Sequence, residues 1–312
     1  MPRFLADTVG RNEGKPFNFR GAARLSQRIP VTVHGMPAAH LLDTGRGAWE
    51  NDFMTADFKY AESRHVTNVD ECRFYHHMDL PGLEEVGKGW DLRKTIDDYL
   101  GRFDFRGKRA LDVGTASGFL TFEMEKRGAD VVSFDMGCSA DWQLVPFGAK
   151  GFDPAKMRAI VDKAVEPTRN SYWLAHRLRQ SRARVYYGDI YNIPDEIGQF
   201  DVVLFGMVLP HLRDPFYALA QSARLSRDAV IITQQAPKIP GPVACFIPKA
   251  TMDPNNLASY NAWWVFSEDC LREMLAVLGF RIESVTRKKH LCTGRNPAGE
   301  EECLTVVARR VQ

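Results

Sequence analysis

Short apolar runs alternate with helix-like patterns through the second half of the chain. Five runs have the length and composition of buried strands, at residues 110–113, 131–134, 185–187, 201–205 and 229–233. Apolar residues at helical spacing separate several of them, at residues 119–127, 156–180 and 215–225. We expect a break in the second of these helices near Pro167. Strands that alternate with helices predict a doubly wound parallel α/β sheet.

The predicted sheet closes with two strands that have no helix between them. Residues 280–285 and 303–308 are joined by a polar loop, which predicts an antiparallel hairpin at the sheet edge. A helix precedes them, with Ser267 as its N-cap and Gly279 just beyond its end. The pattern as a whole therefore predicts seven strands, of which five are parallel.

The N-terminal part of the chain is less regular. Residues 1–70 show no clear period but are too apolar for a disordered tail, so we expect an arm that packs on another part. The stretch WDLRKTIDDYL, residues 90–100, has apolar residues on one helical face and predicts a helix that leads into the sheet. We therefore predict that residues 1–100 form an arm and lid that contribute to a substrate pocket. Residues 101–312 would form a sheet domain, with an insertion at residues 136–173.

Composition narrows the class of protein. The chain has 312 residues, 45% of them hydrophobic, which suffices to bury a large core and excludes disordered, collagen-like and coiled-coil proteins. No apolar run approaches the roughly 20 residues of a membrane helix, and the first residues lack the apolar region of a signal peptide. The six cysteines form no CxxC pair, which argues against a zinc cluster or a disulfide framework. We expect a soluble, cytoplasmic protein, and the net charge of +2 neither demands nor excludes a nucleic-acid partner.

A glycine-containing turn after the first strand carries the candidate chemistry. It reads LDVGTASGF, and glycines at such a turn let a ligand approach backbone N–H groups. The spacing Gly114-x-x-x-Gly118 departs from the GxGxxG of dinucleotide sites. Three acids accompany the turn, because Asp112 precedes it, Asp135 ends the second strand and Asp189 follows the third. Asp135 can accept from ribose hydroxyls and Asp189 from an adenine amino group, so the set favours a cationic adenosine ligand without phosphates.

The sequence around these acids resembles a known family. LDVGTASGFLTFEMEKRGADVVSFD, followed by YYGDIYNIPDEIGQFDVVLFGMVLPHLRDP, is similar to the class I S-adenosylmethionine-dependent methyltransferases over about residues 105–310. FYHHMDLPGLEEVGKGWDLRKTIDDYL and NAWWVFSEDCLREMLAVLGF resemble one subgroup, which includes the bacterial tRNA wobble-uridine modification enzymes and related small-molecule methyltransferases. The resemblance implies a Rossmann-like seven-stranded sheet with an antiparallel edge hairpin and an N-terminal arm or lid.

The resemblance also implies S-adenosyl-L-methionine as cofactor. Asp112 would position its ammonium group, Asp135 would bind the ribose hydroxyls, and Trp90 would cover the cofactor from above. Ala116 departs from the glycine that is commoner in the middle of this turn. The cofactor-binding residues that the resemblance implies are Trp90, Asp112, Gly114, Thr115, Gly118, Asp135, Met136, Asp189, Ile190, Phe205 and Gly206.

Histidines are the natural candidates for a general base. His211 follows the fourth strand, whereas His76 and His77 lie in the FYHHMDLP segment, and His76 matches the histidine of the similar subgroup segment. Each of the three can equally serve a structural role. Aromatic residues in the irregular parts of the chain are candidates for a substrate pocket, although core packing is their default role, and they are Tyr75, Trp142, Tyr172, Trp173 and Trp264. We expect no metal site.

These features support one main hypothesis and two alternatives. The main hypothesis is methyl transfer from S-adenosylmethionine to an O, N or C nucleophile of a small molecule. The first alternative is a transferase that modifies tRNA or another RNA and requires a basic face beside the cofactor. The second is different chemistry on the same cofactor, such as cyclisation or aminocarboxypropyl transfer. The oligomeric state is open.

Overall fold

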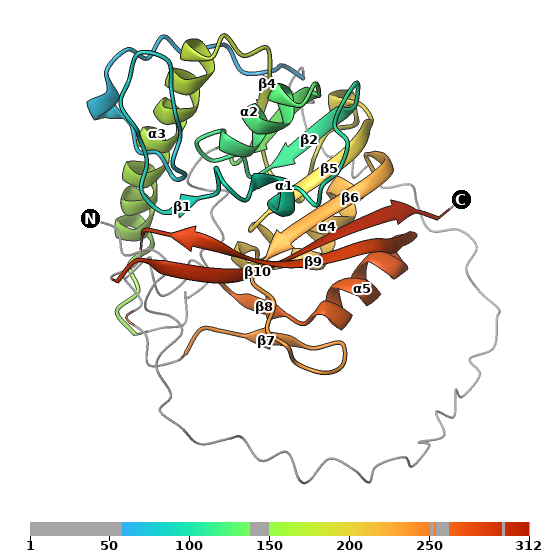
Figure 1. Ribbon diagram of the computed structural model, residues 1–312. Helices are drawn as coiled ribbons and strands as arrows, with labels where there is room; N and C mark the ends of the chain where they lie inside the picture. Colours follow the sequence, from blue (N-terminus) through green and yellow to red (C-terminus); the bar gives the residue numbers. More distant parts are fainter. Residues whose placement is uncertain (1–57, 138–149, 250–252, 254–261, 295–296, 312) are drawn as a thin grey trace, which may run out of the picture. The chain divides into compact units, whose positions relative to one another are not determined.

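The computed structural model describes residues 58–137, 150–249, 253, 262–294 and 297–311. Trp142 and residues 1–57 of the predicted arm lie outside these residues. Within them the chain forms an eight-stranded sheet with the order β1-β9-β10-β6-β5-β2-β3-β4 (Figure 1). Strands β2 to β6 are parallel to one another, and β10, β9 and β1 continue the sheet in antiparallel pairs. The doubly wound α/β sheet with a terminal hairpin is therefore confirmed.

The elements have the following bounds. The strands of the main sheet are β1 (Trp90–Asp91), β2 (Arg109–Val113), β3 (Asp130–Asp135), β4 (Arg184–Tyr187), β5 (Phe200–Gly206), β6 (Ser226–Gln234), β9 (Phe280–Cys292) and β10 (Gly299–Arg310). The helices are α1 (Ile96–Tyr99), α2 (Phe119–Lys126), α3 (Pro154–Leu178), α4 (Pro215–Ala223) and α5 (Glu268–Val277), with 3₁₀ turns η1 (Val69–Glu71), η3 (Asp195–Ile197) and η4 (Leu209–His211). A separate two-stranded antiparallel sheet consists of β7 (Ala244–Phe246) and β8 (Trp264–Phe266).

The sheet is one strand wider than predicted, and the hairpin is longer. The prediction of a single helix over residues 90–100 is wrong in its first half, because Trp90 pairs with Cys292 at the end of β9. Only the last part of that stretch is helical, as α1. β1 therefore borders β9 at this corner of the sheet, and the hairpin is not the outermost element there.

Two apolar clusters cover the two faces of the sheet. Because strand side chains alternate, Ala110 and Val202 face one side, while Leu111 and Val203 face the other. The first side packs against α1, α2 and α3, and the second against α4 and α5. Buried residues on both faces explain the continuous apolar runs of the parallel strands.

Helix starts and stops follow the local sequence, with one exception. The Ser267 hydroxyl accepts a hydrogen bond from the Cys270 N–H at 3.1 Å, which confirms the predicted N-cap of α5. The predicted break near Pro167 is wrong, because α3 runs unbroken through this residue. The buried residues of α3 that follow Pro167 hold the helix in place, so tertiary packing outweighs the local cost of proline. Among the described residues, no helix has the length and apolar character needed to cross a membrane.

Candidate functional site

The candidate site lies at the carboxyl ends of the parallel strands. The neighbours of β2 are β3 on one side and β5 on the other, so the strand order reverses beside β2. Ligands of doubly wound sheets bind at such a switch point. The turn of residues 114–118 follows β2 there, and Gly114 has a φ of 75° that favours glycine.

Glycines let the chain after β5 approach this turn closely. A Cβ on Gly114 would lie 2.5 Å from Cγ2 of Val208, and one on Gly206 would lie 2.4 Å from Cδ1 of Leu120. Real Cβ atoms do not approach other atoms so closely, so larger residues would push the elements apart. The sequence predicts both Gly114 and Gly206 at this site. In the structure Gly114 lies against Val208 and Gly206 lies against Leu120.

Asp135 joins the end of β3 to the turn. Its Oδ2 accepts a hydrogen bond from the Ala116 N–H at 2.8 Å, and its Oδ1 accepts one from the Met136 N–H at 2.8 Å. Its backbone carbonyl accepts from the Gly188 N–H at 2.9 Å, which ties the end of β4 to β3. Burial raises the pKa of Asp135 above its usual value, although these backbone donors oppose the shift. Each carboxylate oxygen keeps a further lone pair for another donor.

Asp112 lies beneath the turn, fully buried on β2. Its Oδ2 accepts a hydrogen bond from the Thr121 hydroxyl at 2.6 Å. Its Oδ1 is buried without a hydrogen-bond partner among the described residues. Burial raises the pKa of Asp112 to about 6, and the hydroxyls of Thr121 and Thr115 partly oppose this rise. An unpartnered buried carboxylate oxygen is costly, and a cationic ligand would satisfy it.

The other predicted cofactor residues differ in their burial and in the elements that they contact. Asp189 is exposed and its Oδ1 accepts from the Tyr191 N–H at 2.9 Å, so it closes a turn after β4, and Ile190 is buried beside it. Met136 packs against Met157 near the start of α3. Phe205 is fully buried on the face of the sheet that α4 and α5 cover. Because it faces away from α2, the structure does not support Phe205 as a wall of the site.

The segment of residues 74–91 packs against the turn and the start of α2. The Tyr75 N–H donates to Oγ of Ser117 at 3.1 Å. The His76 ring stacks on Phe119 with 5.3 Å between ring centroids, and its backbone bridges to Trp90. Trp90 is itself buried in the core cluster. The structure thus brings the FYHH stretch and Trp90 together with the turn, on a strand and an extended segment rather than on a helix.

The three candidate bases lie in different environments. His76 is buried, its Nδ1 has no partner among the described residues, and burial lowers its pKa to about 3. Such an imidazole is neutral and a weak proton acceptor. Both ring nitrogens of His77 are engaged, Nδ1 with Oε1 of Glu85 at 2.6 Å and Nε2 with Oγ1 of Thr293 at 2.7 Å. His211 is half-buried in η4, directly after β5.

The candidate substrate aromatics are dispersed. Tyr172 and Trp173 lie in the core between α3 and the sheet, with exposed fractions of 0% and 2%, so the structure does not support either as a pocket residue. Both belong to α3, within the stretch of residues 156–180 for which the sequence predicts helix, and they face the core. Tyr75 is half-buried beside His76, with 4.9 Å between their rings. The Trp264 indole N–H donates to the Arg213 carbonyl at 3.2 Å, which places it beside η4.

Tyr99 lies beside Gly206, and sequence reasoning did not single it out. Its hydroxyl lies 3.6 Å from the position that a Cβ of Gly206 would take. Burial raises the pKa of Tyr99 well above its usual value, so the hydroxyl stays protonated and can donate. In WDLRKTIDDYL the neighbours Ile96 and Leu100 are apolar, so the sequence indicates a core position for Tyr99. The polar hydroxyl group at the end of this apolar stripe was the feature that could have marked Tyr99 as a candidate.

Within the described part of the chain, one group of side chains has the spacing of metal ligands. Single ligand atoms of His77, Glu85 and Asp91 all lie within 4.8 Å of one another. Arg93 occupies this cluster, with ion pairs to Glu85 at 2.8 Å, Asp91 at 2.7 Å and Asp79 at 2.6 Å. The guanidinium already provides the positive charge there, so the cluster is an ion-pair network in this structure.

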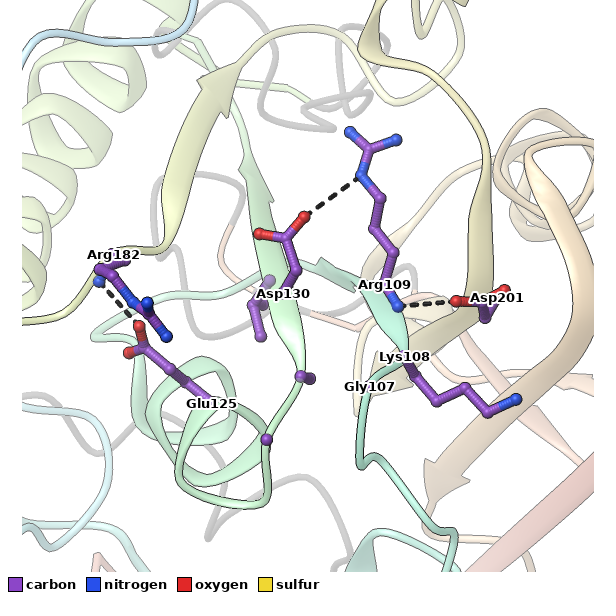
Figure 2. A pocket seen from close by; sticks show the side chains of 10 residues that line it. Gly107, Lys108, Arg109, Glu125, Asp130, Arg182 and Asp201 are labelled. Atoms are coloured by element: carbon purple, nitrogen blue, oxygen red, sulfur yellow. Dashed lines mark hydrogen bonds and ion pairs between the residues drawn. The ribbon is translucent and has the colours of Figure 1, made fainter.

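A shallow polar depression lies at the opposite edge of the sheet, where β2 and β3 begin (Figure 2). Its three carboxylates are each engaged by a neighbouring residue. The backbone N–H of Arg109 donates to Asp201 at 2.7 Å, Nε of Arg109 lies 3.6 Å from Asp130, and the backbone N–H of Arg182 donates to Glu125 at 2.7 Å (Figure 2). The depression is therefore separate from the glycine turn and lacks its unpartnered groups.

Comparison with known proteins adds a family to this geometry. The model of a family described as a methyltransferase domain matches residues 91–285, more than half of the chain. An uncharacterized methyltransferase of Schizosaccharomyces pombe is 27% identical over 139 residues, which are 44% of this chain and 43% of that protein, so the match spans less than half of the relative.

Solved structures with some likeness include two methyltransferases with bound S-adenosylhomocysteine. The 1,6-didemethyltoxoflavin-N1-methyltransferase of Burkholderia thailandensis is 22% identical, with a TM-score of 0.43 over 70% of this chain and 76% of that chain. The magnesium protoporphyrin IX methyltransferase of Synechocystis PCC 6803 is 15% identical, with a TM-score of 0.42 over 70% of this chain and 81% of that chain.

Proposed function

The chain belongs to the methyltransferase-domain family, and from this premise we propose that it transfers a methyl group from S-adenosyl-L-methionine to an O, N or C nucleophile of a small molecule. The observation that carries the proposal is a pair of carboxylates at neighbouring strand ends. Asp112 and Asp135 flank the turn of residues 114–118, and the turn itself is hydrogen-bonded to Asp135.

The residues at the turn suit this cofactor. S-adenosyl-L-methionine supplies, when bound, a methyl group on a positively charged sulfur. The unpartnered Oδ1 of Asp112 suits an ammonium group, because a buried carboxylate oxygen gains most from a charged donor. Asp135 retains lone pairs for ribose hydroxyls. Gly114 has no side chain to block the approach of a ligand to the turn.

The remaining assignments follow from place. Met136 and Ile190 offer apolar contacts at the ends of β3 and β4, where the adenine would lie, and the Asp189 carboxylate is within that region. Thr115 and Gly118 shape the turn, and Gly206 with Tyr99 borders it from β5 and α1. Trp90 is buried in the core cluster, and its backbone bridges to His76 of the 74–91 segment. We therefore assign it to holding this segment in place rather than to covering the cofactor.

We assign the acceptor to small molecules because two arginines, one bonded to Asp91 of β1 and one to the chain after β3, are already engaged. Arg93 binds three carboxylates, and Nη2 of Arg169 donates to the carbonyls of Met136 and Gly137 at 2.6 Å each. Neither guanidinium is available to an RNA phosphate without losing these contacts. The described part of the arm, the 74–91 segment, borders the turn and would help to choose the acceptor.

His211 is the proposed general base where the nucleophile needs one. His211 lies in η4 beyond the carboxyl end of β5, where ligands of such sheets bind. The low pKa of His76 makes that imidazole a poorer proton acceptor, and His77 is bonded to Glu85 and Thr293. A hydroxyl or a protonated amine must lose its proton during transfer, whereas a neutral amine can react without a base. The larger contribution to the rate would come from holding the nucleophile in line with the methyl group and excluding water.

A product-resolved screen tests the proposal. The protein is incubated with S-adenosylmethionine and small-molecule pools, with release of S-adenosylhomocysteine as the readout and mass spectrometry to find the methylated acceptor. Methylthioadenosine in place of S-adenosylhomocysteine would identify aminocarboxypropyl chemistry. Turnover only with tRNA, together with RNA binding that weakens steeply with salt, would identify the RNA alternative.

A further inference from the structure

A chain of buried hydroxyl groups runs beneath the glycine turn and ends at Asp112. The Tyr172 hydroxyl lies 2.9 Å from Oγ of Ser133, which lies 2.7 Å from Oγ1 of Thr121. Thr121 in turn lies 2.6 Å from Oδ2 of Asp112. All four side chains are fully buried, and they come from α3, β3, α2 and β2.

The direction of every proton in this chain follows from its carboxylate end. An ionised Asp112 only accepts, so Thr121 gives its single proton to Oδ2. Thr121 then has no proton left for Ser133, so Ser133 donates to Thr121, and by the same argument Tyr172 donates to Ser133. Burial holds the pKa of Tyr172 well above its usual value, so its proton stays in place. Oγ1 of Thr115 also lies 2.9 Å from Oγ1 of Thr121, and the Thr115 hydroxyl likewise favours the charged form of Asp112.

Packing alone does not account for this arrangement. Apolar side chains of similar shape would fill the same space without the cost of burying four polar groups. Hydrogen bonds that all point one way polarise one another and strengthen the last donor in the chain. That last donor fixes one oxygen of Asp112, while the other oxygen, Oδ1, has no partner among the described residues. The chain therefore orients a carboxylate whose second oxygen is left for a ligand.

We propose that the chain Tyr172–Ser133–Thr121 positions the Asp112 carboxylate for the ammonium group of the cofactor, so that Ser133 and Tyr172 set cofactor affinity without touching it. This inference rests on the proposed function, because it takes the ligand of Asp112 to be S-adenosylmethionine. Ser133 and Tyr172 are positioning residues, and both act through Thr121.

The same geometry predicts a pH signature. Each donor in the chain favours the charged form of Asp112, so losing one raises the pKa of Asp112 further above about 6. Asp135 on β3 is a charged group that faces Asp112 and acts in the same direction. Tyr99 of α1 and Tyr172 of α3 also face it and stay neutral, because burial raises the pKa of each well above its usual value. Affinity lost by a chain variant should therefore recover as the pH rises.

The test is calorimetric titration of the apo protein with S-adenosylhomocysteine, which carries the same ammonium group, at about pH 6.5 and about pH 8. Ser133→Ala should weaken binding about tenfold at the lower pH, as expected for weakening a hydrogen bond to a charged group, and less at the higher pH. Tyr172→Phe should show the same pH trend with a smaller effect, because it lies one bond further from Asp112. Ser222→Ala, at a buried serine of α4 on the other face of the sheet, is the matched control and should bind like the wild type.

The outcomes separate the inference from the proposed function. A wild-type protein that does not bind S-adenosylhomocysteine refutes the proposed function. A wild type that binds, with Ser133→Ala and Tyr172→Phe unchanged at both pH values, overturns the positioning chain alone. A loss that is equal at both pH values, or that Ser222→Ala shares, also overturns it, because it reports general destabilisation. Circular dichroism checks folding, and Tyr172→Phe serves if Ser133→Ala does not fold.

Discussion

The acid at the end of β3 has two separable duties. Asp135 accepts two backbone hydrogen bonds that shape the turn, and it is proposed to bind the ribose of the cofactor. Asp112 differs, because buried hydroxyl groups contribute to holding it, and the Thr121 hydroxyl donates to its Oδ2 at 2.6 Å. Neither distinction is visible in the sequence, where both residues read as acids at strand ends.

Replacing Asp135 by Ala should abolish tight binding of S-adenosylhomocysteine while the fold survives. The variant loses the proposed ribose acceptor and leaves the Ala116 N–H without its partner, which costs about 1–3 kcal/mol of stability. Calorimetry measures the affinity, and thermal unfolding measures the stability. Asp130→Ala, at the exposed acid that begins the same strand, is the control and should bind like the wild type. Unchanged affinity in Asp135→Ala would remove the cofactor assignment.

Among the histidines, His211 should matter for turnover and His76 should not. With an acceptor that must lose a proton, His211→Ala should lower kcat by about 10²-fold or more, with little change in cofactor affinity. His76→Phe keeps a ring against Phe119 and should leave the pH profile of kcat unchanged, because burial already keeps the pKa of His76 at about 3. Full turnover in both variants would mean that neither histidine is the base.

At the scale of elements, hydrophobic periodicity predicted the regular apolar strands and missed a very short strand and the charged part of a long one. The five parallel strands are apolar on both faces, so their runs were readable. β1 has two residues and no period, and β9 continues past residue 285 through Arg287, Lys288 and Lys289, which hide its strand character. Charges of this kind are common on strands near a sheet edge, where they discourage pairing with other chains.

The side chain of Thr293 adds to the β1–β9 pairing that joins the 74–91 segment to the β9–β10 hairpin. Oγ1 of Thr293 meets Nε2 of His77 at 2.7 Å and accepts from the Gly89 N–H at 3.1 Å. Thr293→Val should therefore increase local opening of the segment, with amide exchange near residues 76–90 faster by about one order of magnitude. Hydrogen exchange with mass spectrometry measures this effect. Thr286→Val, in the same hairpin, should leave exchange there unchanged, and equal rates in the two variants would show that the contact does not hold the segment.

At the scale of the whole molecule, the site was predictable because topology fixes it. Any doubly wound sheet places its strand ends and first turn at one edge, so the sequence could place Asp112, Gly114 and Asp135 together as candidate residues. Burial was harder to predict, because it depends on which elements cover each face. Phe205 and Gly206 are adjacent in sequence, yet the first packs under α4 and the second borders the turn. The alternation of strand side chains predicts that these two residues face opposite sides of the sheet. His76 lies on an irregular segment, so no sequence pattern predicted its burial.

Burying Asp112 should leave a mark on the stability of the whole fold. The pKa of Asp112 is about 6 in the folded protein and 3.8 in the ordinary case, so between these values the folded state keeps a proton that the unfolded state has released. Stability therefore falls as the pH rises through this window, and the penalty reaches about 3 kcal/mol above pH 6. A cofactor ammonium that pairs with Asp112 would offset this penalty.

Urea unfolding of the apo protein between about pH 5 and pH 8 measures the effect, with Asp112→Asn as the reference. The variant cannot ionise at this position, while the other titrating groups are retained, so subtracting the two curves isolates Asp112. The wild type should lose about 1–2 kcal/mol relative to Asp112→Asn across this range, because roughly half of the full penalty is already present at pH 5. Parallel curves would show that Asp112 keeps an ordinary pKa. A buried carboxylate with an ordinary pKa is already stabilised by its surroundings and would not need a cationic ligand.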